Sequence, residues 1–353
     1  MAIQHRESRL LELDALRGLA ALAVVLYHYS SRYEQIYSYS NGSPIEFVFG
    51  KFGVELFFMI SGFVIFMSLN KIPPGWHGIK IFTLARFSRL YPAYWAAMTV
   101  TFLAVSYFGL PGREVALIDI PANATMLPNL FKSPMVDGVY WTLEKELLFY
   151  TWMAVLIFAD RLDIIRIVLL IWLFISATHS YIATKLGMDG VFIYKIFKNA
   201  TILEWIPYFG FGIIAYLRYS KDKYAPIDLL LILIILCKIY STKTYVEFLF
   251  ILFLMLIVHM MITERLAFLV SKPLLFLGTI SYSLYLVHQN IGYIVIRETL
   301  PYLMSPWLSW LLALLISIGM ATTITYTIEK PANSLLRRYR VKFAADAKEG
   351  HQK

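Results

Sequence analysis

The sequence predicts an all-α integral membrane protein, a bundle of about ten transmembrane helices with both termini in the cytoplasm. Its 353 residues are 59% hydrophobic and only 16% charged, whereas about a quarter of the residues in a soluble domain are charged. The mean hydropathy is +0.64, and the apolar residues are spread along the whole chain. We therefore expect one membrane domain rather than a soluble domain with an anchor.

Ten apolar segments approach the length needed to cross about 30 Å of hydrocarbon. They lie near residues 14–33, 51–70, 91–110, 141–159, 164–183, 200–217, 226–240, 246–262, 274–296 and 307–328. The seventh is short and the eighth is modest in length, so the helix limits within 226–262 stay open. With a cytoplasmic N-terminus, 21 of the 32 Lys and Arg residues fall on the cytoplasmic side, in agreement with the positive-inside rule.

The domain organisation is expected to be simple, with a transmembrane domain over residues 1–335 and a basic cytoplasmic tail over 336–353. The N-terminus shows no evident cleavage site, so the first apolar segment is expected to be retained. The longest external loop is 111–140. The single cysteine, Cys237, excludes an intrachain disulfide and a cysteine-based metal site. Membrane topology explains the net charge of +9, so no nucleic-acid partner is expected.

The first apolar segment, LDALRGLAALAVVLYHY, carries an arginine and a histidine on one helix face. Arg17 and His28 are eleven positions apart, which at about 100° per residue makes roughly three turns and about 16 Å. Asp14 lies one turn before Arg17 and can pair with it. Each residue alone fits a snorkelling arginine or a hydrogen-bonded core histidine. Together on one face they indicate a polar track through the membrane.

Two further segments place charged residues near the membrane surfaces. Arg86 and Arg89, in LARFSRLYPAYW, are three positions apart on the predicted cytoplasmic side. Arginine side chains bind phosphate with two parallel hydrogen bonds, although positive-inside charge would explain this pair equally well. Glu55, in GVELFFMISGF, lies near the outer end of the second segment. It is either an interfacial carboxylate or a ligand-binding group.

The stretch VYWTLEKELLFY begins the fourth apolar segment with two glutamates. Glu146 lies deeper than Glu144 and Lys145, and a carboxylate at that depth needs a partner. His28 is expected at a similar depth. A Glu–His pair would raise the basicity of the imidazole and fix its tautomer. Pairing of Glu146 with a structural lysine or arginine is the alternative.

The stretch LGTISYSLYLVHQN gives the ninth segment a polar face. Ser281, Tyr285 and His288 follow i, i+4, i+7 spacing. A lone membrane histidine is usually structural, and this applies to His288. The last segment closes with TYTIEKP, which places Glu329 and Lys330 at the cytoplasmic interface.

The chain has no P-loop, no metal-ligand cluster and no G-x-S-x-G elbow, which argues against an ATPase, a metalloenzyme and a serine hydrolase. A ligand with phosphates at one end and a reactive group about 16 Å away fits the Arg17–His28 spacing, and acyl-coenzyme A has that shape. His28 would then deprotonate an acceptor hydroxyl as a general base. Two alternatives stay open: a proton-coupled transporter of an acyl group or small solute, and a non-catalytic subunit of polysaccharide export.

At these same stretches the chain resembles the membrane acyltransferase-3 family. The shared motifs are R-x10-H in RGLAALAVVLYH, the GVELFFMISGF helix, R-x-x-R in RFSR, WTLEKE, SYSLYLVH and the closing IEKP. Several motifs in the family's order, over about residues 10–335, make the resemblance specific. Thr142 stands where a serine is commoner. The length resembles that of members that modify exopolysaccharide or lipopolysaccharide O-antigen.

The resemblance implies a multi-pass enzyme of the bacterial inner membrane. Its expected activity is transfer of an acyl group, usually acetyl, from cytoplasmic acyl-CoA to a carbohydrate hydroxyl at the periplasmic face. Expected partners are acyl-CoA as donor, a free or lipid-linked carbohydrate acceptor and membrane lipids, with no metal. The expected site residues are His28 and Glu146 for catalysis, Arg17, Arg86, Arg89, Ser281 and Tyr285 for the donor, and Glu55, Trp141 and His288 for the acceptor.

Overall fold

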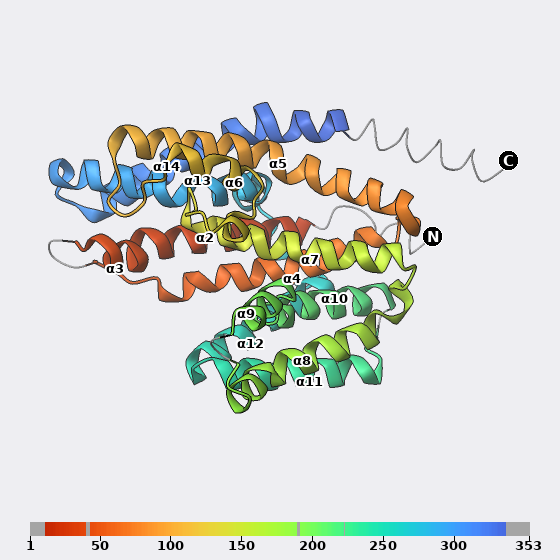
Figure 1. Ribbon diagram of the computed structural model, residues 1–353. Coiled ribbons are helices and arrows are strands. Elements are labelled where there is room, and N and C mark those ends of the chain that lie inside the picture. Colours follow the sequence, from red (N-terminus) through yellow and green to blue (C-terminus); the bar gives the residue numbers. More distant parts are fainter. Residues whose placement is uncertain (1–10, 40–42, 189–190, 222, 337–353) are drawn as a thin grey trace. The chain divides into compact units, whose positions relative to one another are not determined.

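The computed structural model describes residues 11–39, 43–188, 191–221 and 223–336, and these residues form helices and connecting turns without a β-strand. The α-helices are α2 (Leu11–Tyr27), α3 (Tyr33–Tyr37), α4 (Gly53–Leu69), α5 (Gly75–Phe108), α6 (Ile120–Ala124), α7 (Trp141–Phe158), α8 (Ile165–Lys185), α9 (Phe192–Ala200), α10 (Ile206–Lys221), α11 (Pro226–Thr242), α12 (Tyr245–Ile262), α13 (Lys272–Leu303) and α14 (Pro306–Ile324) (Figure 1). Two π-helical turns, His28–Arg32 and Thr325–Glu329, continue α2 and α14. Apart from Leu336, the predicted basic tail lies outside the described residues.

Each of the ten predicted apolar segments contains an α-helix, which confirms the all-helical fold class, although the sixth segment is a turn before Ile206. Within the described residues, four helical segments are long and apolar enough to cross a membrane: Val48–Leu69, Leu162–Lys185, Tyr245–Ile262 and Pro306–Leu336. The full count of ten spans and the cytoplasmic location of the termini stay predictions. Helix α5 begins well before the predicted segment 91–110 and continues through Pro92.

The chain folds into two compact units. Unit 1 comprises the residues up to Gly53, then Thr83–Glu144, and the chain from Leu269 onward. Unit 2 comprises Val54–Phe82 and Lys145–Phe268. Unit 1 therefore contains the first and the last predicted apolar segments and the loop 111–140. Unit 2 contains the middle of the chain.

In unit 1, α13 packs against both α2 and α14. Glycines allow the backbones of α2 and α13 to approach closely. A Cβ atom on Gly278 would lie only 2.0 Å from the Asp14 carbonyl oxygen, and one on Gly18 only 2.6 Å from the Leu274 oxygen. Small residues at such crossings are the usual means of close packing between membrane helices. This contact fixes the register in which α2 and α13 face each other.

In unit 2, α10 packs beside α4 through a second pair of glycines. A Cβ atom on Gly62 would lie 2.1 Å from the Phe209 oxygen, and one on Gly212 would lie 2.0 Å from the Met59 oxygen. Helices α8 and α11 lie side by side (Figure 1). They are joined by Arg166, whose Nε and Nη2 donate to the two Asp228 oxygens at 2.7 and 3.0 Å. Because Asp228 is buried, this two-point bond also fixes the pairing of the two helices.

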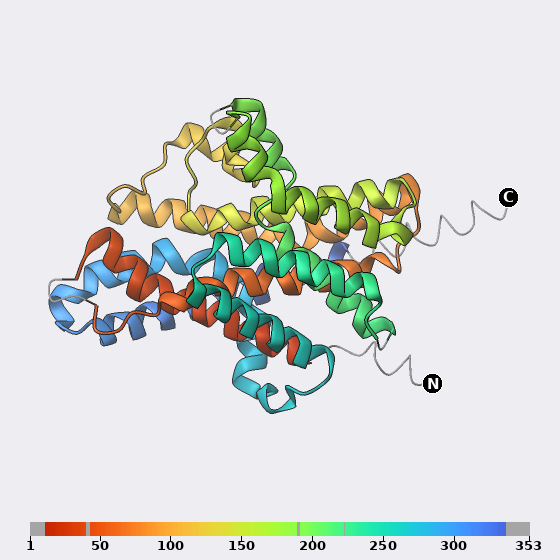
Figure 2. The same cartoon turned by 90° about the horizontal axis from the view of Figure 1, so that it is seen from below.

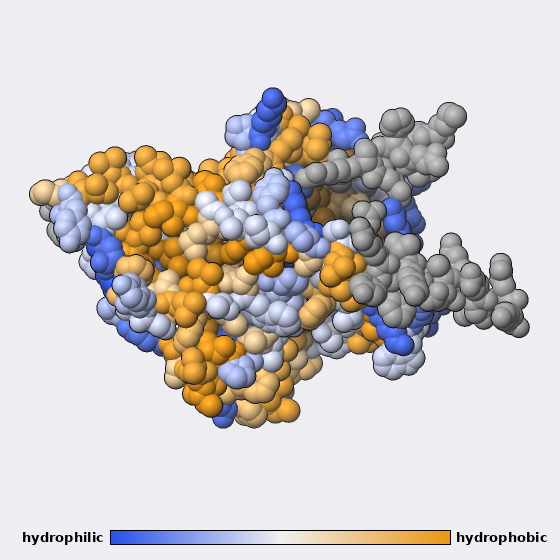
Figure 3. Space-filling model, turned by 90° about the horizontal axis from the view of Figure 1, so that it is seen from above, coloured by the Kyte–Doolittle hydropathy of each residue, from blue (hydrophilic) through white to orange (hydrophobic). Residues whose placement is uncertain are grey.

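Apolar side chains cover broad areas of the face seen in Figure 3. Exposed large apolar residues are frequent on α8, α9, α12 and α14. A soluble monomer seldom exposes contiguous apolar areas of this kind. Together with the apolar helices, this surface identifies a membrane protein.

Candidate active site

His28 lies where α2 changes from α-helical to π-helical winding. A π-turn inserts one extra residue into a helix and is often found at functional sites. The His28 side chain is partly accessible, whereas His288, on the facing helix α13, is fully buried. The two rings meet edge to face with centroids 4.9 Å apart. The structure therefore brings together two histidines that are 260 positions apart in the sequence.

The hydrogen bonds of this pair determine where the protons lie. Nδ1 of His288 lies 2.9 Å from the Tyr285 carbonyl oxygen and 3.2 Å from the Leu284 carbonyl oxygen. Since carbonyl oxygens only accept, this Nδ1 carries the proton, and Nε2 of the neutral ring is an acceptor. His28 Nδ1 lies 3.0 Å from that Nε2 and 2.9 Å from the Val24 carbonyl oxygen.

Both neighbours of His28 Nδ1 are thus acceptors, so His28 Nδ1 carries the proton in the neutral pair. Its Nε2 is then the basic nitrogen, and no described residue forms a hydrogen bond with it. A neutral imidazole with one fixed N–H and one free lone pair is the form that a general base requires.

Tyr29 holds the neighbouring backbone in place. Its buried hydroxyl donates to the His288 carbonyl oxygen at 3.1 Å and lies 2.8 Å from Ser317 Oγ on α14. Its ring lies against Gly292, where a Cβ atom would come within 2.2 Å of the ring. Tyr29 therefore joins all three central helices of unit 1 next to the histidine pair.

The arginines predicted for the donor lie around a second π-turn. Glu329 ends that turn and accepts a hydrogen bond from Ser283 Oγ at 3.0 Å. Its carboxylate lies within electrostatic range of Arg89 and Arg17. Residues from three sequence motifs, RGLAALAVVLYH, RFSR and SYSLYLVH, thus lie near the Glu329 carboxylate. Arg86 is three residues before Arg89 on the same helix.

The other α13 residues predicted for the donor make bonds within unit 1. Ser281 Oγ donates to the Gly278 carbonyl oxygen of its own helix at 2.8 Å. The Tyr285 hydroxyl lies 2.9 Å from Thr142 Oγ1. Trp141 begins α7 beside that threonine. The Tyr285–Thr142 contact connects the SYSLYLVH helix to the WTLEKE motif. The sequence alone did not indicate this contact.

Glu146 accepts hydrogen bonds from the Ser61 hydroxyl, at 2.8 Å, and from the Tyr150 hydroxyl. Among the described residues no lysine or arginine pairs with it, so the alternative partner considered from the sequence is not observed. Glu146 belongs to unit 2 and His28 to unit 1. Their pairing therefore stays a prediction.

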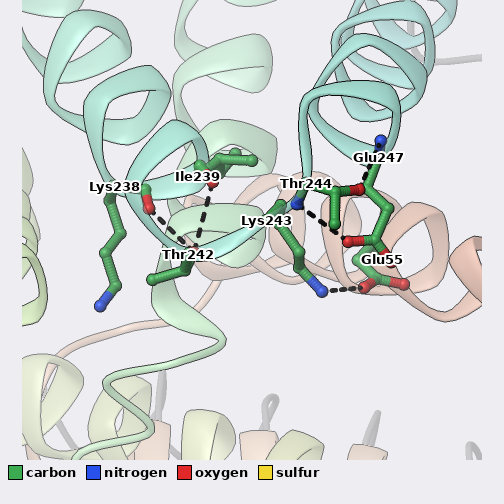
Figure 4. Close-up of polar contacts among 7 residues, drawn as sticks. All are labelled: Glu55, Lys238, Ile239, Thr242, Lys243, Thr244 and Glu247. Carbon is green, nitrogen blue, oxygen red and sulfur yellow. Dashed lines mark hydrogen bonds and ion pairs between the residues drawn. The ribbon is translucent and has the colours of Figure 1, made fainter.

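Glu55 is buried in unit 2 and lies 3.5 Å from Lys243 Nζ in an ion pair (Figure 4). Lys243 directly follows the last residue of α11, and the next residue, Thr244, caps α12 by accepting from the Glu247 backbone N–H. The lysine that neutralises Glu55 therefore comes from a short helix connection. The predicted role of Glu55 in acceptor binding stays a prediction.

Sequence reasoning missed Asp137, which fastens the loop 111–140 to α13. Its fully buried carboxylate accepts from the Val139 N–H at 3.1 Å and the Asn290 N–H at 3.0 Å. Asn290 Nδ2 donates to the Val136 carbonyl oxygen at 2.9 Å. Burial raises the pKa of Asp137 to about 6, against the lowering effect of these bonds and of Arg113. The available signal was VDGVY, a turn sequence directly before the WTLEKE motif.

Within the described part of the chain, no group of three or more His, Cys, Asp or Glu side chains could hold a metal ion. The arrangement instead offers one neutral histidine base and a separate group of arginines. Such a site suits acid–base chemistry on a ligand with an anionic end.

These features fit a membrane enzyme that transfers an acyl group. Residues 10–328 match the acyltransferase domain family known as acyltransferase 3, and the chain belongs to this family. The resemblance noted in the sequence is thus confirmed over nearly the whole chain.

Two relatives are informative. The chain is 26% identical over 303 residues to a candidate acetyltransferase, ORF330, of Acidianus two-tailed virus, covering 77% of this chain and 80% of the relative. It is 35% identical over 117 residues to protein 2 of the picA locus of Rhizobium radiobacter, covering 31% of this chain and 53% of that protein. No solved structure matches the chain.

Proposed function

We propose that this membrane acyltransferase moves an acyl group, most simply acetyl, from acyl-CoA on the cytoplasmic side of a bacterial inner membrane to a hydroxyl of a surface carbohydrate. The observation that carries the proposal is the histidine pair, whose hydrogen bonds leave Nε2 of His28 free as a base. Family membership supports the acyl chemistry. The arginines around Glu329 supply cationic groups for the phosphates of the donor.

The reaction needs one proton transfer and one substitution at carbon. His28 Nε2 takes the proton of the acceptor hydroxyl as the hydroxyl oxygen attacks the thioester carbonyl carbon. A new C–O bond forms, the C–S bond breaks, and the departing thiolate receives the proton from His28. The products are an ester and free coenzyme A, and the histidine returns to its starting tautomer.

The remaining predicted residues take supporting roles in this proposal. Arg17, Arg86 and Arg89 hold the donor phosphates, and Ser281 and Tyr285 line the path of the donor. Glu55, Trp141 and His288 are assigned to the acceptor side. Glu146 is assigned to the catalytic group, where its carboxylate stabilises the positive charge that His28 carries after it takes the proton.

The test uses the full chain in lipid nanodiscs with radiolabelled acetyl-CoA, in parallel with succinyl-CoA, and surface oligosaccharides as acceptors. We expect label in an alkali-labile ester on the sugar. The variant His28→Ala should lower the rate constant by about 10²–10⁴, the usual contribution of a general base. His259→Ala is the matched control, since that ring contacts Tyr224 in unit 2. Full transfer by His28→Ala would refute the proposal, as would acyl flux into liposomes without sugar modification.

A further inference from the structure

A group of unassigned polar side chains surrounds His28 within unit 1. Arg113, from the loop 111–140, and Arg32, from the π-turn, both lie within electrostatic range of the His28 ring. The Tyr293 ring lies 6.4 Å from the His28 ring, centroid to centroid. None of these three residues belongs to the motifs recognised in the sequence. Their position beside the proposed base raises the question of what they bind.

Two of the side chains converge on the backbone of Gly138. A Cβ atom at Gly138 would lie 2.9 Å from Arg113 Nη1 and 3.0 Å from both the oxygen and the nitrogen of the Gln289 carboxamide. The absence of a side chain at this position therefore lets a guanidinium and a carboxamide occupy neighbouring positions. Gln289 is only 3% exposed, and its carboxamide lies next to the Tyr293 hydroxyl.

Tyr293 adds a buried hydroxyl to this group. Its side chain is fully buried, and Gln289 is the polar side chain beside the hydroxyl, yet the hydroxyl makes no hydrogen bond of good geometry with the described residues. A buried hydroxyl without a partner costs stability, and a polar side chain buried without one requires an explanation. A bound ligand with hydroxyl or carboxylate oxygens would satisfy both Tyr293 and Gln289.

Arg113 lies between a cleft and the histidine pair. It lines the cleft together with Phe102, Ser106 and Glu114, and its charge reaches His28. The rings of Tyr33 and Tyr37 pack 5.5 and 5.7 Å from the Tyr293 ring. Aromatic rings beside hydrogen-bonding groups suit a molecule with apolar and polar faces, as a sugar ring has.

The charge of this group is positive. In the described part of the chain no carboxylate lies within ion-pair distance of Arg113 or Arg32, and Arg32 donates only to the neutral Gln35 at 3.0 Å. The nearby acids are engaged by backbone groups. Asp137 accepts two N–H bonds, and the Glu114 carboxylate accepts from the Arg113 backbone N–H at 3.2 Å. Two guanidinium groups are thus available to an anion.

We propose that Arg113, Gln289 and Tyr293 form the acceptor subsite beside His28 and that the acceptor is an acidic sugar whose carboxylate pairs with Arg113. The proposal rests on the acyltransferase function above, because it takes the neighbouring base to be His28. A carboxylate matches the planar guanidinium with two parallel hydrogen bonds. Gln289 and Tyr293 then bind ring oxygens or hydroxyls and direct one hydroxyl toward the base.

The experiment measures binding, so that it does not depend on turnover. The full chain in nanodiscs is titrated with a glucuronate-terminated trisaccharide and with the glucose-terminated trisaccharide that differs only at C6. We expect the acidic probe to bind about tenfold more tightly or better, as a charge-assisted bond would provide. Arg113→Gln should abolish the difference. Arg161→Gln, which alters an exposed arginine paired with Asp163 in unit 2, should preserve it.

A second variant, Gly138→Ala, tests the geometry, because its methyl group displaces both Arg113 and Gln289. It should weaken binding of both probes. Three results would overturn the proposal. The wild type could bind the two probes equally, it could bind neither probe, or Arg113→Gln could retain the preference for the acidic probe. Tighter binding of a glucose 6-phosphate-terminated probe would overturn the assignment of a carboxylate.

Failure of this proposal can be distinguished from failure of the proposed function. If label moves from acetyl-CoA to sugar without any preference for the acidic probe, the function stands and the subsite is wrong. If the acidic probe binds through Arg113 but no ester forms, the subsite stands and the function is wrong. A loss of turnover in Arg113→Gln that is equal for both sugars, with no difference in binding, would assign Arg113 to the transition state instead.

Discussion

The substitution His288→Leu tests whether the second histidine fixes the tautomer of the first. It removes one of the two acceptors of the His28 Nδ1–H and leaves the Val24 carbonyl oxygen in place. One hydrogen bond of this kind contributes about 0.5–1.5 kcal/mol. If that energy is lost from the reactive tautomer, kcat falls about 2- to 13-fold. This is far less than the loss expected when His28 itself is removed.

The matched variant is His288→Gln, since the glutamine side-chain oxygen can accept a hydrogen bond where His288 Nε2 does. We expect it to keep kcat within about twofold of wild type, as expected if the hydrogen bond is retained. The KM for acetyl-CoA should be unchanged in both variants, because two of the arginines proposed to bind the donor, Arg17 and Arg89, lie near Glu329.

The assay combines steady-state acetyl transfer with ¹⁵N chemical shifts of the His28 ring in selectively labelled protein. The shifts should report Nδ1–H in wild type and His288→Gln, and a mixture of tautomers in His288→Leu. Wild-type kcat in His288→Leu, or no advantage of the glutamine variant over the leucine variant, would show that the reasoning is wrong. An Nε2–H ring in wild type would do the same.

Three further predictions concern helix packing, pH and the donor. Gly278→Val should destabilise unit 1 by about 1–3 kcal/mol or more, because the valine Cβ atom would meet the Asp14 carbonyl oxygen. Gly319→Val, whose Cβ atom would have open space, is the control. Thermal unfolding in detergent measures both variants, and equal midpoints would contradict the close contact. Burial raises the pKa of Asp137 from 3.8 to about 6. Its protonated carboxyl therefore contributes about 3 kcal/mol to the free energy of unfolding below pH 4, and this contribution is lost as the pH rises through 6. Asp137→Asn should remove that part of the pH dependence, and an unchanged profile of midpoint against pH would refute the assignment. Arg89→Gln should raise the KM for acetyl-CoA about tenfold with kcat nearly unchanged, because a charge-assisted contact with the donor phosphate is lost. Arg161→Gln is the control. An unaltered KM in Arg89→Gln would exclude Arg89 from the donor site.

Much of the fold followed from local signals, because apolar segments of sufficient length are helices whatever they pack against. Helix α5 shows the limit of that reasoning. Its first half is polar, with Lys80, Arg86 and Arg89, and therefore lies outside the apolar run. Pro92 is the second residue of the predicted segment 91–110, in keeping with the preference of proline for the first turn of a helix. The helix in fact runs through Pro92.

Candidate site residues could be named from the sequence, but the contacts among them could not. Spacing placed Arg17 and His28 on one face, and Ser281, Tyr285 and His288 on another. The partner of His28 depends on how α2 meets α13, which the glycines at Gly18 and Gly278 determine. No periodicity within a single segment contains that information. Arg113 and Gln289 were missed because a loop residue and a helix residue become neighbours only after folding.

The interlocked glycines of α2 and α13 also bear on how the acyl group could cross the membrane. A carrier that alternates its access rocks one set of helices against another around the binding site. Rocking at this seam would have to separate backbones that meet at Gly18 and Gly278, and would break the hydrogen bond between the two histidines. The proposed base and its partner therefore keep a fixed position relative to each other within unit 1. Long, thin substrates then have to reach them from either side of the membrane.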